Sequence, residues 1–239
     1  MAIINFTNVH YHIDDKKIIQ DVNLNTQTKR LGVIGRNGSG KTSFARLLSG
    51  LVAPTQGTVR IDDIDVAKDR RAALKQVGIV FQNPDHQILF PTVIEEIGFG
   101  LRQLGYTKSE AASKSEAILE NFGLSHWRDS AVEPLSGGQK HLLCLIAVLV
   151  MQPSLLILDE PFVGLDIPTK MQLSHYLKDL PITLVQITHQ CEDLQDYAEI
   201  LWFDDGKVRM QGAPEQVFPA YKKSMTKQGR RNDLVDLAS

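Results

Sequence analysis

The sequence has little cysteine, few aromatic residues and almost no net charge. Only two cysteines, Cys144 and Cys191, occur among 239 residues, which excludes the disulfide framework of small secreted domains. Two isolated thiols suit the reducing environment of the cytoplasm. Aromatic residues make up 7% of the chain, yet 43% of it is hydrophobic. We therefore expect one globular domain with a substantial core, with or without an insertion.

Strong charge and long apolar runs are also missing. The formal net charge is -2 and the isoelectric point about 6.4, so no global positive field invites nucleic acid, which is not an expected partner. The longest apolar run, residues 142–151, is about half of the roughly 20 residues that a membrane-spanning helix needs. The first residues lack the basic flank and apolar stretch of a secretory signal. We expect the chain to meet a membrane only through a partner.

Short apolar runs rich in β-branched residues alternate with helical patterns. The predicted strands are residues 3–9, 31–34, 77–81, 155–158, 182–187 and 200–203. The predicted helices between them are residues 42–51, 168–180 and 190–197. Asp204-Asp205-Gly206 predicts a late β-hairpin turn, because glycine tolerates positive φ. This alternation predicts an α/β fold with a largely parallel sheet.

The middle and the end of the chain differ from this pattern. The helix-like segments of the middle are residues 93–104, 108–122 and 138–151. They predict a helical subdomain inserted at about residues 83–151 of a domain that covers residues 1–219. Residues 220–239 are polar and basic with few apolar anchors. They predict a C-terminal tail with little fixed structure.

Residues 35–42, GRNGSGKT, follow a predicted strand and open a predicted helix, as a phosphate-binding loop requires. Glycines let backbone N–H groups approach phosphate oxygens, and the helix N-terminus adds positive potential. Lys41 is expected to reach the β and γ phosphates and Thr42 to ligate Mg²⁺. A chance glycine-rich turn is the alternative, and a dinucleotide fold is disfavoured because Lys41 and Thr42 interrupt its glycine pattern. The nucleotide-binding residues predicted here are Gly35, Arg36, Asn37, Gly38, Ser39, Gly40, Lys41, Thr42 and Ser43.

Residues 155–161, LLILDEP, combine a buried strand with two carboxylates at its carboxyl end. Ligands gather at that end of the strands in α/β sheets. Asp159 is expected to hold hydrated Mg²⁺, and Glu160 to orient or deprotonate the attacking water. The alternative is an acidic strand end that caps the next turn.

Residues 135–139, LSGGQ, offer a serine hydroxyl, unhindered glycine amides and a helix N-terminus, which suit an anion. They cannot serve a phosphate loop that already encloses its phosphates. The hypothesis that resolves this is that they face the γ phosphate of a second copy of the chain. The alternative is an ordinary helix start capped by Ser136.

Together with Gln82, residues 164–166 and Thr188-His189, these motifs resemble the ATP-binding cassette (ABC) ATPases over about residues 3–218. The resemblance implies an α/β P-loop NTPase fold with a RecA-like mixed sheet core, an antiparallel β part and an inserted helical subdomain. It also implies a head-to-tail dimer. In the dimer that the resemblance implies, two ATP molecules would be sandwiched between the phosphate loop of one copy and the LSGGQ turn of the other, and the dimer would close on ATP and open after hydrolysis.

The same resemblance assigns roles to further residues. Gln82 would sense Mg²⁺ and the attacking water, Asp166 would communicate across the dimer, and His189 would contact the γ phosphate. A polar loop residue, a helix cap and a surface imidazole are the respective alternatives. The expected catalytic residues are Lys41, Glu160 and His189, and the expected metal residues are Thr42, Gln82 and Asp159. The remaining expected ATP-contacting residues are Ser136, Gly137, Gly138, Gln139 and Asp166.

Residues 81–101 are similar to the ATPases of energy-coupling factor (ECF) transporters, which import vitamins and transition metals. Asn83, Pro84, Asp85 and Gln87 carry this likeness. It implies an ATPase that energises an importer, with biotin favoured over cobalt. A transmembrane coupling subunit would dock near residues 82–104 at the cytoplasmic face of the membrane, beside a separate substrate-binding membrane subunit. A generic loop into the helical insert is the alternative.

The assembly and the rival functions stay open at this point. Because every motif is intact, a homodimer is favoured, and a heterodimer with a paralogue remains an alternative. The ATPase of another ABC importer, a soluble ABC regulator and a catalytically silent ATP-binding module are the other hypotheses. Tandem cassettes, long coiled coils and zinc modules, which soluble ABC proteins often carry, are not visible in the sequence.

Two positions depart from the ABC pattern. The aromatic residue that usually stacks on adenine is replaced by Ile13, whereas nearby Tyr11 is more consistent with a core residue. The Gln-Arg pair that often follows the LSGGQ turn is replaced by His141 and Leu142, which removes a charge from that helix. Which residue contacts adenine is therefore not decided by the sequence.

Overall fold

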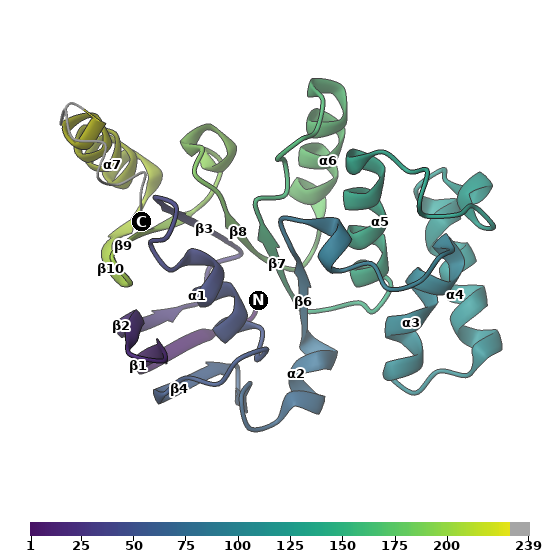
Figure 1. The fold of residues 1–239 in the computed structure, drawn as a ribbon, viewed down its shortest axis with the longest axis horizontal. Coiled ribbons are helices and arrows are strands. Elements are labelled where there is room, and N and C mark those ends of the chain that lie inside the picture. Colours follow the sequence, from purple (N-terminus) through teal and green to yellow (C-terminus); the bar gives the residue numbers. More distant parts are fainter. Residues whose placement is uncertain (230–239) are drawn as a thin grey trace.

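A six-stranded sheet forms the centre of the molecule (Figure 1). The structure, a computed structural model, describes residues 1–229. The strand order is β10-β9-β3-β8-β7-β6, and only β10 is antiparallel to its neighbour. The strands are β3 (Arg30–Gly35), β6 (Val77–Val80), β7 (Leu155–Asp159), β8 (Thr183–Ile187), β9 (Glu199–Asp204) and β10 (Lys207–Gly212). The predicted α/β fold and its largely parallel sheet are confirmed.

The inner strands of this sheet are mostly apolar because both of their faces are covered. Every residue of β7 and β8 is buried, as is usual in parallel sheets. The register pairs Asp159 of β7 with Ile187 of β8, and Val33 of β3 with the same Ile187. The carboxyl ends of these three strands therefore lie along one edge, where ligands bind in open α/β sheets.

A second sheet supplies the antiparallel part of the fold. Its strand order is β2-β1-β4-β5, and its strands are β1 (Ile4–Ile13), β2 (Lys16–Thr26), β4 (Gln56–Ile61) and β5 (Ile64–Asp65). Helix α1 (Lys41–Leu48) joins the two sheets. Phe44 on α1 stacks on Phe6 of β1 with ring centroids 4.8 Å apart and lies 5.1 Å from the ring of Phe203 on β9. One apolar core thus fixes the position of α1 at the edge of the main sheet.

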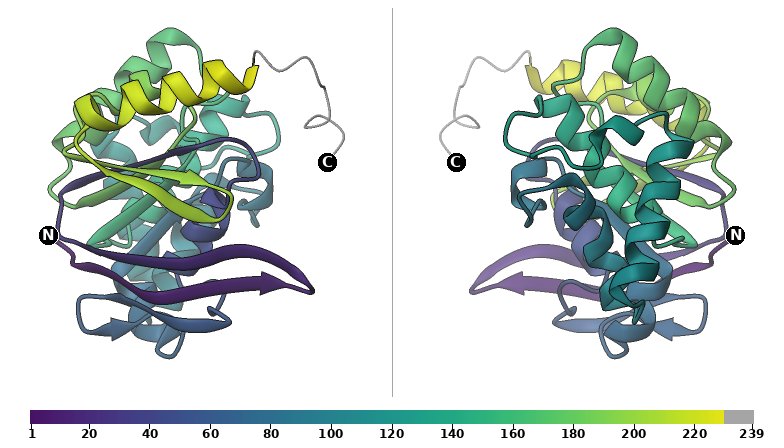
Figure 2. Two further views of the ribbon diagram at one scale, coloured as in Figure 1. Left: turned by 90° about the vertical axis from the view of Figure 1, so that its left-hand side faces the viewer. Right: turned by 90° about the vertical axis from the view of Figure 1, so that its right-hand side faces the viewer.

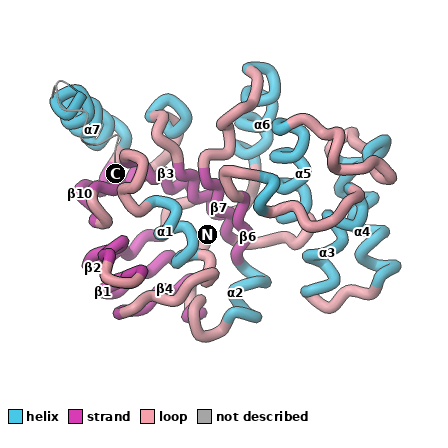
Figure 3. The backbone as a smooth tube through the Cα atoms, in the orientation of Figure 1, coloured by secondary structure: helices cyan, strands magenta, loops and turns pink. Residues whose placement is uncertain are grey.

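Only helices lie between β6 and β7, as the tube in Figure 3 shows. They are η1 (Pro84–His86), α3 (Val93–Gln103), α4 (Lys108–Asn121), η2 (Ser125–Trp127) and α5 (Gly137–Leu149). These helices share a core of their own around Ile97, Leu119 and Ile146. In Figure 2 they cover one side of the molecule, whereas the antiparallel sheet and α7 lie on the other. The inserted helical subdomain of the predicted fold is therefore present.

The long apolar run at residues 142–151 is mostly buried, and its residues 142–149 belong to α5. It packs both into the helical core and against β6 and β7 through Cys144 and Leu145. Within residues 1–229, no helix combines the length and apolar character needed to cross a bilayer.

The expected boundary between domain and tail falls inside a helix and is corrected here. Helix α7 runs from Pro214 to Gly229, so residues 220–229 are helical. Apolar anchors explain this, since Tyr221 is buried and packs edge-on against Trp202 of β9 with centroids 5.5 Å apart. Residues 230–239, the rest of the expected tail, lie outside the described residues.

The sequence pattern does not predict β2, β4, β5 or the short helix α2 (Arg70–Gln76). Strand β2 alternates buried and exposed residues at the edge of its sheet, so its apolar residues never form a run. The predicted helix at residues 190–197 is shorter than expected and is the 3₁₀ turn η3 (Cys191–Leu194). Helix α6 (Ile167–Asp179), between β7 and β8, agrees with the prediction to within one residue at each end.

Candidate functional site

Lys41 is the first residue of α1, and its ammonium is held by the loop between β3 and this helix. Its Nζ donates to the backbone oxygens of Gly35 and Arg36, each at 2.8 Å. The side chain is 7% exposed, and this burial lowers the pKa of Lys41, while Glu160 and Asp159 act in the opposite direction. Phosphate oxygens of a nucleotide would be stronger, charged acceptors for the same ammonium.

The start of α1 has the features of an anion site. Gly40, its N-cap, has φ 105°, and a Cβ at this position would lie 3.1 Å from the backbone oxygen of Ile18. No side chain caps the helix and no acidic residue lies in its first turn, so its N–H groups and positive dipole end are left for a ligand. The hydroxyl of Ser39 is buried without a hydrogen-bond partner. A bound phosphate group would satisfy both.

Asp159 is the last residue of β7 and is 4% exposed. Burial raises its pKa, and a hydrogen bond from the side chain of Thr42 partly offsets that rise. A buried carboxylate next to a hydroxyl has the chemistry of a Mg²⁺ site.

Glu160 has left-handed backbone geometry, with φ 52°, which is uncommon for a residue with a side chain. Its N–H donates to the backbone oxygen of Ile187 at 2.9 Å. Its carboxylate lies 2.9 Å from Nδ1 of His189. Because a carboxylate only accepts, Nδ1 carries the proton, and Nε2 can donate to a phosphate oxygen only when the ring is an imidazolium.

A cavity of about 330 Å³ joins the expected metal residues. It is lined by Thr42, Arg46, Phe81, Gln82, Asn83, His86 and Asp159. All three expected metal residues therefore share one space, and their oxygen atoms suit Mg²⁺. Arg46 and His86 were not expected there. Arg46 lies one helical turn after Thr42 on α1, so the spacing could have indicated it.

The LSGGQ turn forms a complete capping box at the start of α5. Gln139 N–H donates to the Ser136 hydroxyl oxygen at 3.3 Å, and Ser136 N–H donates to Oε1 of Gln139 at 2.8 Å. The helix-cap alternative is thus present, and the serine hydroxyl proton is still left to donate. None of residues 135–139 lines the cavity beside Thr42 and Asp159. In Figure 1, α5 and α1 lie on opposite sides of β6 and β7.

Asp166 caps α6, which is the alternative role that the sequence offered for this residue. Its carboxylate accepts from Thr169 N–H at 2.8 Å, and this backbone hydrogen bond lowers the pKa of Asp166. The preceding residue, Leu165, approaches the LSGGQ turn, because a Cβ on Gly138 would lie 3.1 Å from its Cδ2. The turn before α6 and the start of α5 are therefore neighbours.

The two candidates for adenine contact lie in different surroundings. Tyr11 packs against the main core, whereas Ile13 at the end of β1 is 48% exposed. Tyr11 is paired with Ile19 of β2, whose side chain lies beside Gly40 of the phosphate loop. The hairpin of β1 and β2 is therefore next to the nucleotide residues, and Ile13 is its exposed apolar residue.

Replacing Ile13 by Tyr should strengthen ATP binding about threefold to tenfold, because an aromatic ring stacks on a base better than an aliphatic chain does. Titration with a fluorescent ATP analogue measures this. Tyr11→Leu serves as the matched variant and should lower the melting temperature while leaving affinity within about twofold of wild type. A larger loss of affinity for Tyr11→Leu than gain for Ile13→Tyr would assign adenine to Tyr11.

The two residues that replace the usual Gln-Arg pair after the LSGGQ turn, His141 and Leu142, are both at least partly buried. Leu142 lies against the helical core, which explains why no charge is needed there. His141 is 6% exposed, and burial lowers its pKa, while the backbone of Gln82, Gly137 and Phe81 favours the charged ring.

Two residues of the ECF-like segment, Gln87 and Asp85, differ in orientation: one side chain points into the protein and the other lies at the surface. Gln87 points inward, since its Oε1 accepts from Phe81 N–H at 3.0 Å and its Nε2 donates to the backbone oxygen of Ile79 at 3.3 Å. Asp85 is outward and pairs with Lys140 of α5, 2.8 Å apart. A groove of about 430 Å³ opens here, lined by Asp85, Ile88, Leu89, Phe90, Pro91, Ala131, Val132, Glu133 and Lys140. We call these nine residues the docking groove.

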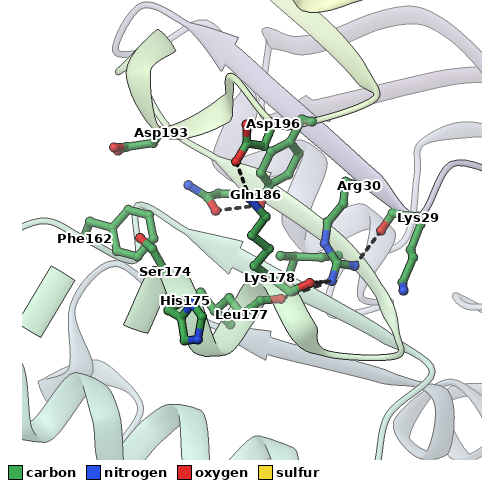
Figure 4. Close-up of a pocket in the computed structure, with 12 residues that line it drawn as sticks. Lys29, Arg30, Phe162, Ser174, His175, Leu177, Lys178, Gln186, Asp193 and Asp196 are labelled. Atoms are coloured by element: carbon green, nitrogen blue, oxygen red, sulfur yellow. Dashed lines mark hydrogen bonds and ion pairs between the residues drawn. The ribbon is translucent and has the colours of Figure 1, made fainter. Parts of the chain in front are cut away.

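A separate cavity of about 460 Å³ lies between α6 and the segment that follows β8 (Figure 4). None of the expected nucleotide residues lines it. At its edge, the guanidinium of Arg30 donates to the backbone oxygens of Leu177, Lys178, Leu180 and Ile182. Arg30 thus attaches the end of α6 to the start of β3.

Comparison with known proteins agrees with this geometry. The ABC transporter family model matches residues 19–163. The biotin transport ATP-binding protein BioM of Rhodobacter capsulatus is 40% identical over 94% of this chain and 96% of its own length. The energy-coupling factor transporter ATP-binding protein EcfA1 of Caldanaerobacter subterraneus is 35% identical over 84% of this chain and 75% of its own.

Solved structures give the same result. CbiO1 of Clostridium perfringens, part of the ABC transporter complex CbiONQ, superimposes with a TM-score of 0.78 at 28% identity, covering 96% of this chain and 95% of that one. The cassette MJ0796, a dimer bound to ADP and phosphate, shares the fold with a TM-score of 0.77 at 24% identity, over 88% of this chain and 98% of that one. By sequence and by fold, the chain belongs to the ABC transporter family of ATPases.

Proposed function

We propose that this ATPase is the ATP-hydrolysing subunit of an energy-coupling factor importer, with biotin as the favoured cargo and Mg²⁺ as its metal. The position of Glu160 is the observation that supports ATP hydrolysis. Its carboxylate is held against His189, and it follows directly after the buried Asp159. The similarity to BioM along nearly the whole of both chains supports the importer and the cargo. The chain would act at the cytoplasmic face of the membrane.

The residues divide the reaction among themselves. Lys41, the N–H groups of α1 and the Ser39 hydroxyl would bind the phosphates, while Thr42, Asp159 and Gln82 would hold Mg²⁺, which neutralises phosphate charge. Glu160 would accept the proton of the attacking water. His189, oriented by Glu160, would as an imidazolium donate from Nε2 to a phosphate oxygen.

A second copy of the chain would complete each site. Ser136, Gly137 and Gly138 do not line the cavity beside Thr42 and Asp159, and they keep donors for an anion at the start of α5. A head-to-tail pair would bring these donors to the γ phosphate of the other copy, with Asp166 close to the junction. A homodimer needs no other chain, because both half-sites are present in this one.

The docking groove is the proposed contact for the membrane coupling subunit. Its exposed residues combine Leu89, which is 67% exposed, with the carboxylate of Glu133, whereas the carboxylate of Asp85 is paired with Lys140. A partner segment with apolar and basic side chains would be complementary to it. A separate membrane subunit would bind the cargo.

Replacing Leu89 by Asp should reduce recovery of the coupling subunit in detergent pull-downs by at least about tenfold, since it places a charge where an apolar contact forms. Leu74→Asp is the matched control, because Leu74 is 43% exposed on α2, away from the groove. Both variants should melt close to wild type. Equal recovery for the two would remove the groove from the interface.

An uptake assay in cells identifies the imported molecule. Cells that carry the chain with the membrane subunits it co-purifies with should accumulate labelled biotin, and the Glu160→Gln variant should not. Uptake of cobalt instead would correct the cargo alone. Recovery of ribosomes or DNA without membrane subunits would contradict the importer.

A further inference from the structure

Lys170 of α6 contacts both of the loops that carry the paired side chains of Glu160 and His189. Its N–H donates to the backbone oxygen of Asp166 at 2.9 Å, so Lys170 lies one helical turn after the cap of α6. Its ammonium is 5.3 Å from the centre of the Phe162 ring, which is within the range of a cation–π contact. Phe162 comes two residues after Glu160. On this side Lys170 therefore reaches the loop that follows β7.

The same ammonium is also bound to the loop that follows β8. Nζ of Lys170 lies 2.5 Å from Oδ1 of Asp193 and donates to Oε1 of Gln190 at 3.4 Å. Gln190 follows His189 directly, and its N–H donates to the hydroxyl oxygen of Thr188 at 3.1 Å. The backbone therefore turns at His189, and Lys170 holds the residues that come after this turn.

The ion pair of Lys170 and Asp193 is partly buried. The side chain of Asp193 is 6% exposed and that of Lys170 is 34% exposed. Removing one partner of such a pair leaves an uncompensated buried charge, which reaches water only if the chain around it moves. Asp193 belongs to η3, and His189 lies two residues before the start of η3. A movement of Asp193 would therefore displace the imidazole.

We propose that Lys170 is a positioning residue for ATP hydrolysis, which holds the loop of His189 against the loop of Glu160. Nδ1 of His189 and Oε1 of Glu160 are 2.9 Å apart, and a misplacement of catalytic groups by about 1 Å can cost about 100-fold in rate. The inference rests on the proposed function, because Lys170 acts only through these two residues. ATP binding depends instead on Lys41 and the start of α1, so the loss should fall on kcat.

The test is ATP hydrolysis by the complete complex over a range of ATP concentrations at constant Mg²⁺. Lys170→Met keeps most of the length of the side chain but removes its charge. We expect kcat to fall about tenfold or more, with KM within about twofold of wild type. Lys170→Arg keeps the charge, and its kcat should stay within about threefold of wild type.

The control is Lys178→Met, the same change on the same helix. Lys178 is paired with Asp196 at 2.8 Å, and the two side chains are 65% and 76% exposed. Exposed pairs of this kind contribute little, so this variant should keep the wild-type kcat and KM.

A double variant separates positioning from a loss of stability. Lys170→Met leaves the carboxylate of Asp193 unpaired, so its melting temperature should fall. Adding Asp193→Asn removes that charge, and the double variant should melt closer to wild type. Its kcat should stay low, because the ion pair that joins α6 to η3 is still missing. Recovery of kcat together with the melting temperature would mean that Lys170 only neutralises a buried charge.

Three further results would overturn the positioning role. They are a kcat of Lys170→Met equal to that of Lys178→Met, a Lys170→Arg enzyme as slow as Lys170→Met, and a loss that lies in KM rather than in kcat. If Lys170→Met does not fold, the double variant takes its place, and a wild-type kcat there overturns the role as well. A His189→Ala variant that hydrolyses ATP at the wild-type rate contradicts the proposed function instead.

Discussion

Glu160→Gln should lower ATP hydrolysis by about 10²- to 10⁴-fold, the usual contribution of a general base. Glutamine keeps the shape of the side chain but cannot accept the proton of the attacking water. ATP should still bind, because Lys41 and the start of α1 are unchanged. Phosphate release measures the loss, and size-exclusion chromatography with Mg²⁺ and ATP should show the variant at twice the mass of the monomer.

The matched variant is Glu192→Gln, the same change at a carboxylate that is 65% exposed and paired with Lys222. It should hydrolyse ATP at the wild-type rate. If Glu160→Gln released phosphate as fast as Glu192→Gln, another residue would have to be the base. If it stopped hydrolysis but stayed monomeric with ATP, Glu160 would remain catalytic while the sandwiched dimer would lose its support.

Asp159→Asn should stabilise the nucleotide-free protein while it weakens the response of hydrolysis to Mg²⁺ by about 10- to 100-fold. Burial raises the pKa of Asp159, so the folded chain binds this proton more tightly than the unfolded chain does. The stability that the protonated form provides is present below the ordinary pKa near 4 and is lost as pH rises through the raised folded value. Asparagine does not ionise and avoids that loss.

Melting curves at pH 5 and pH 8 test this expectation. The variant should melt above wild type at pH 8, by about 2 to 4 °C for each kcal/mol of relieved charge burial, and the difference should be smaller at pH 5. Asp63→Asn, at an exposed position, should show neither effect. A variant that melts below wild type at pH 8 would mean that the ionised Asp159 stabilises the empty site.

The phosphate loop and the carboxylates of β7 are predictable because short stretches of sequence determine them. A glycine-rich turn between a buried strand and a helix, and two acids after an apolar strand, are local patterns. The parallel order of the strands then brings Asp159 and Glu160 to the edge of the sheet that also carries the phosphate loop. For this part of the site, the motifs predict the residues, and the parallel strand order predicts that these residues lie at the same edge of the sheet.

Features that depend on distant contacts cannot be predicted in this way. Strand β2 begins with two exposed lysines and ends in alternating buried and exposed side chains, and pairing with β1 makes it a strand. The polar composition of α7 predicts a tail, whereas Tyr221 packs against Trp202 and keeps it helical. His86 of η1 lines the same cavity as Thr42 and Arg46 of α1, which no spacing in the sequence indicates.

The hydrogen bonds of Arg30 to the end of α6 restrict how Asp166 can move. The guanidinium donates to four carbonyl oxygens near the last turn of α6, and Figure 4 draws two of these residues, Leu177 and Lys178. Asp166 lies at the opposite end of the same helix. Near the other end of α6, Lys170 is paired with Asp193 of η3, so the helix is held at both ends. Asp166 is therefore expected to shift together with η3 and the start of β3 as one rigid unit, rather than on its own.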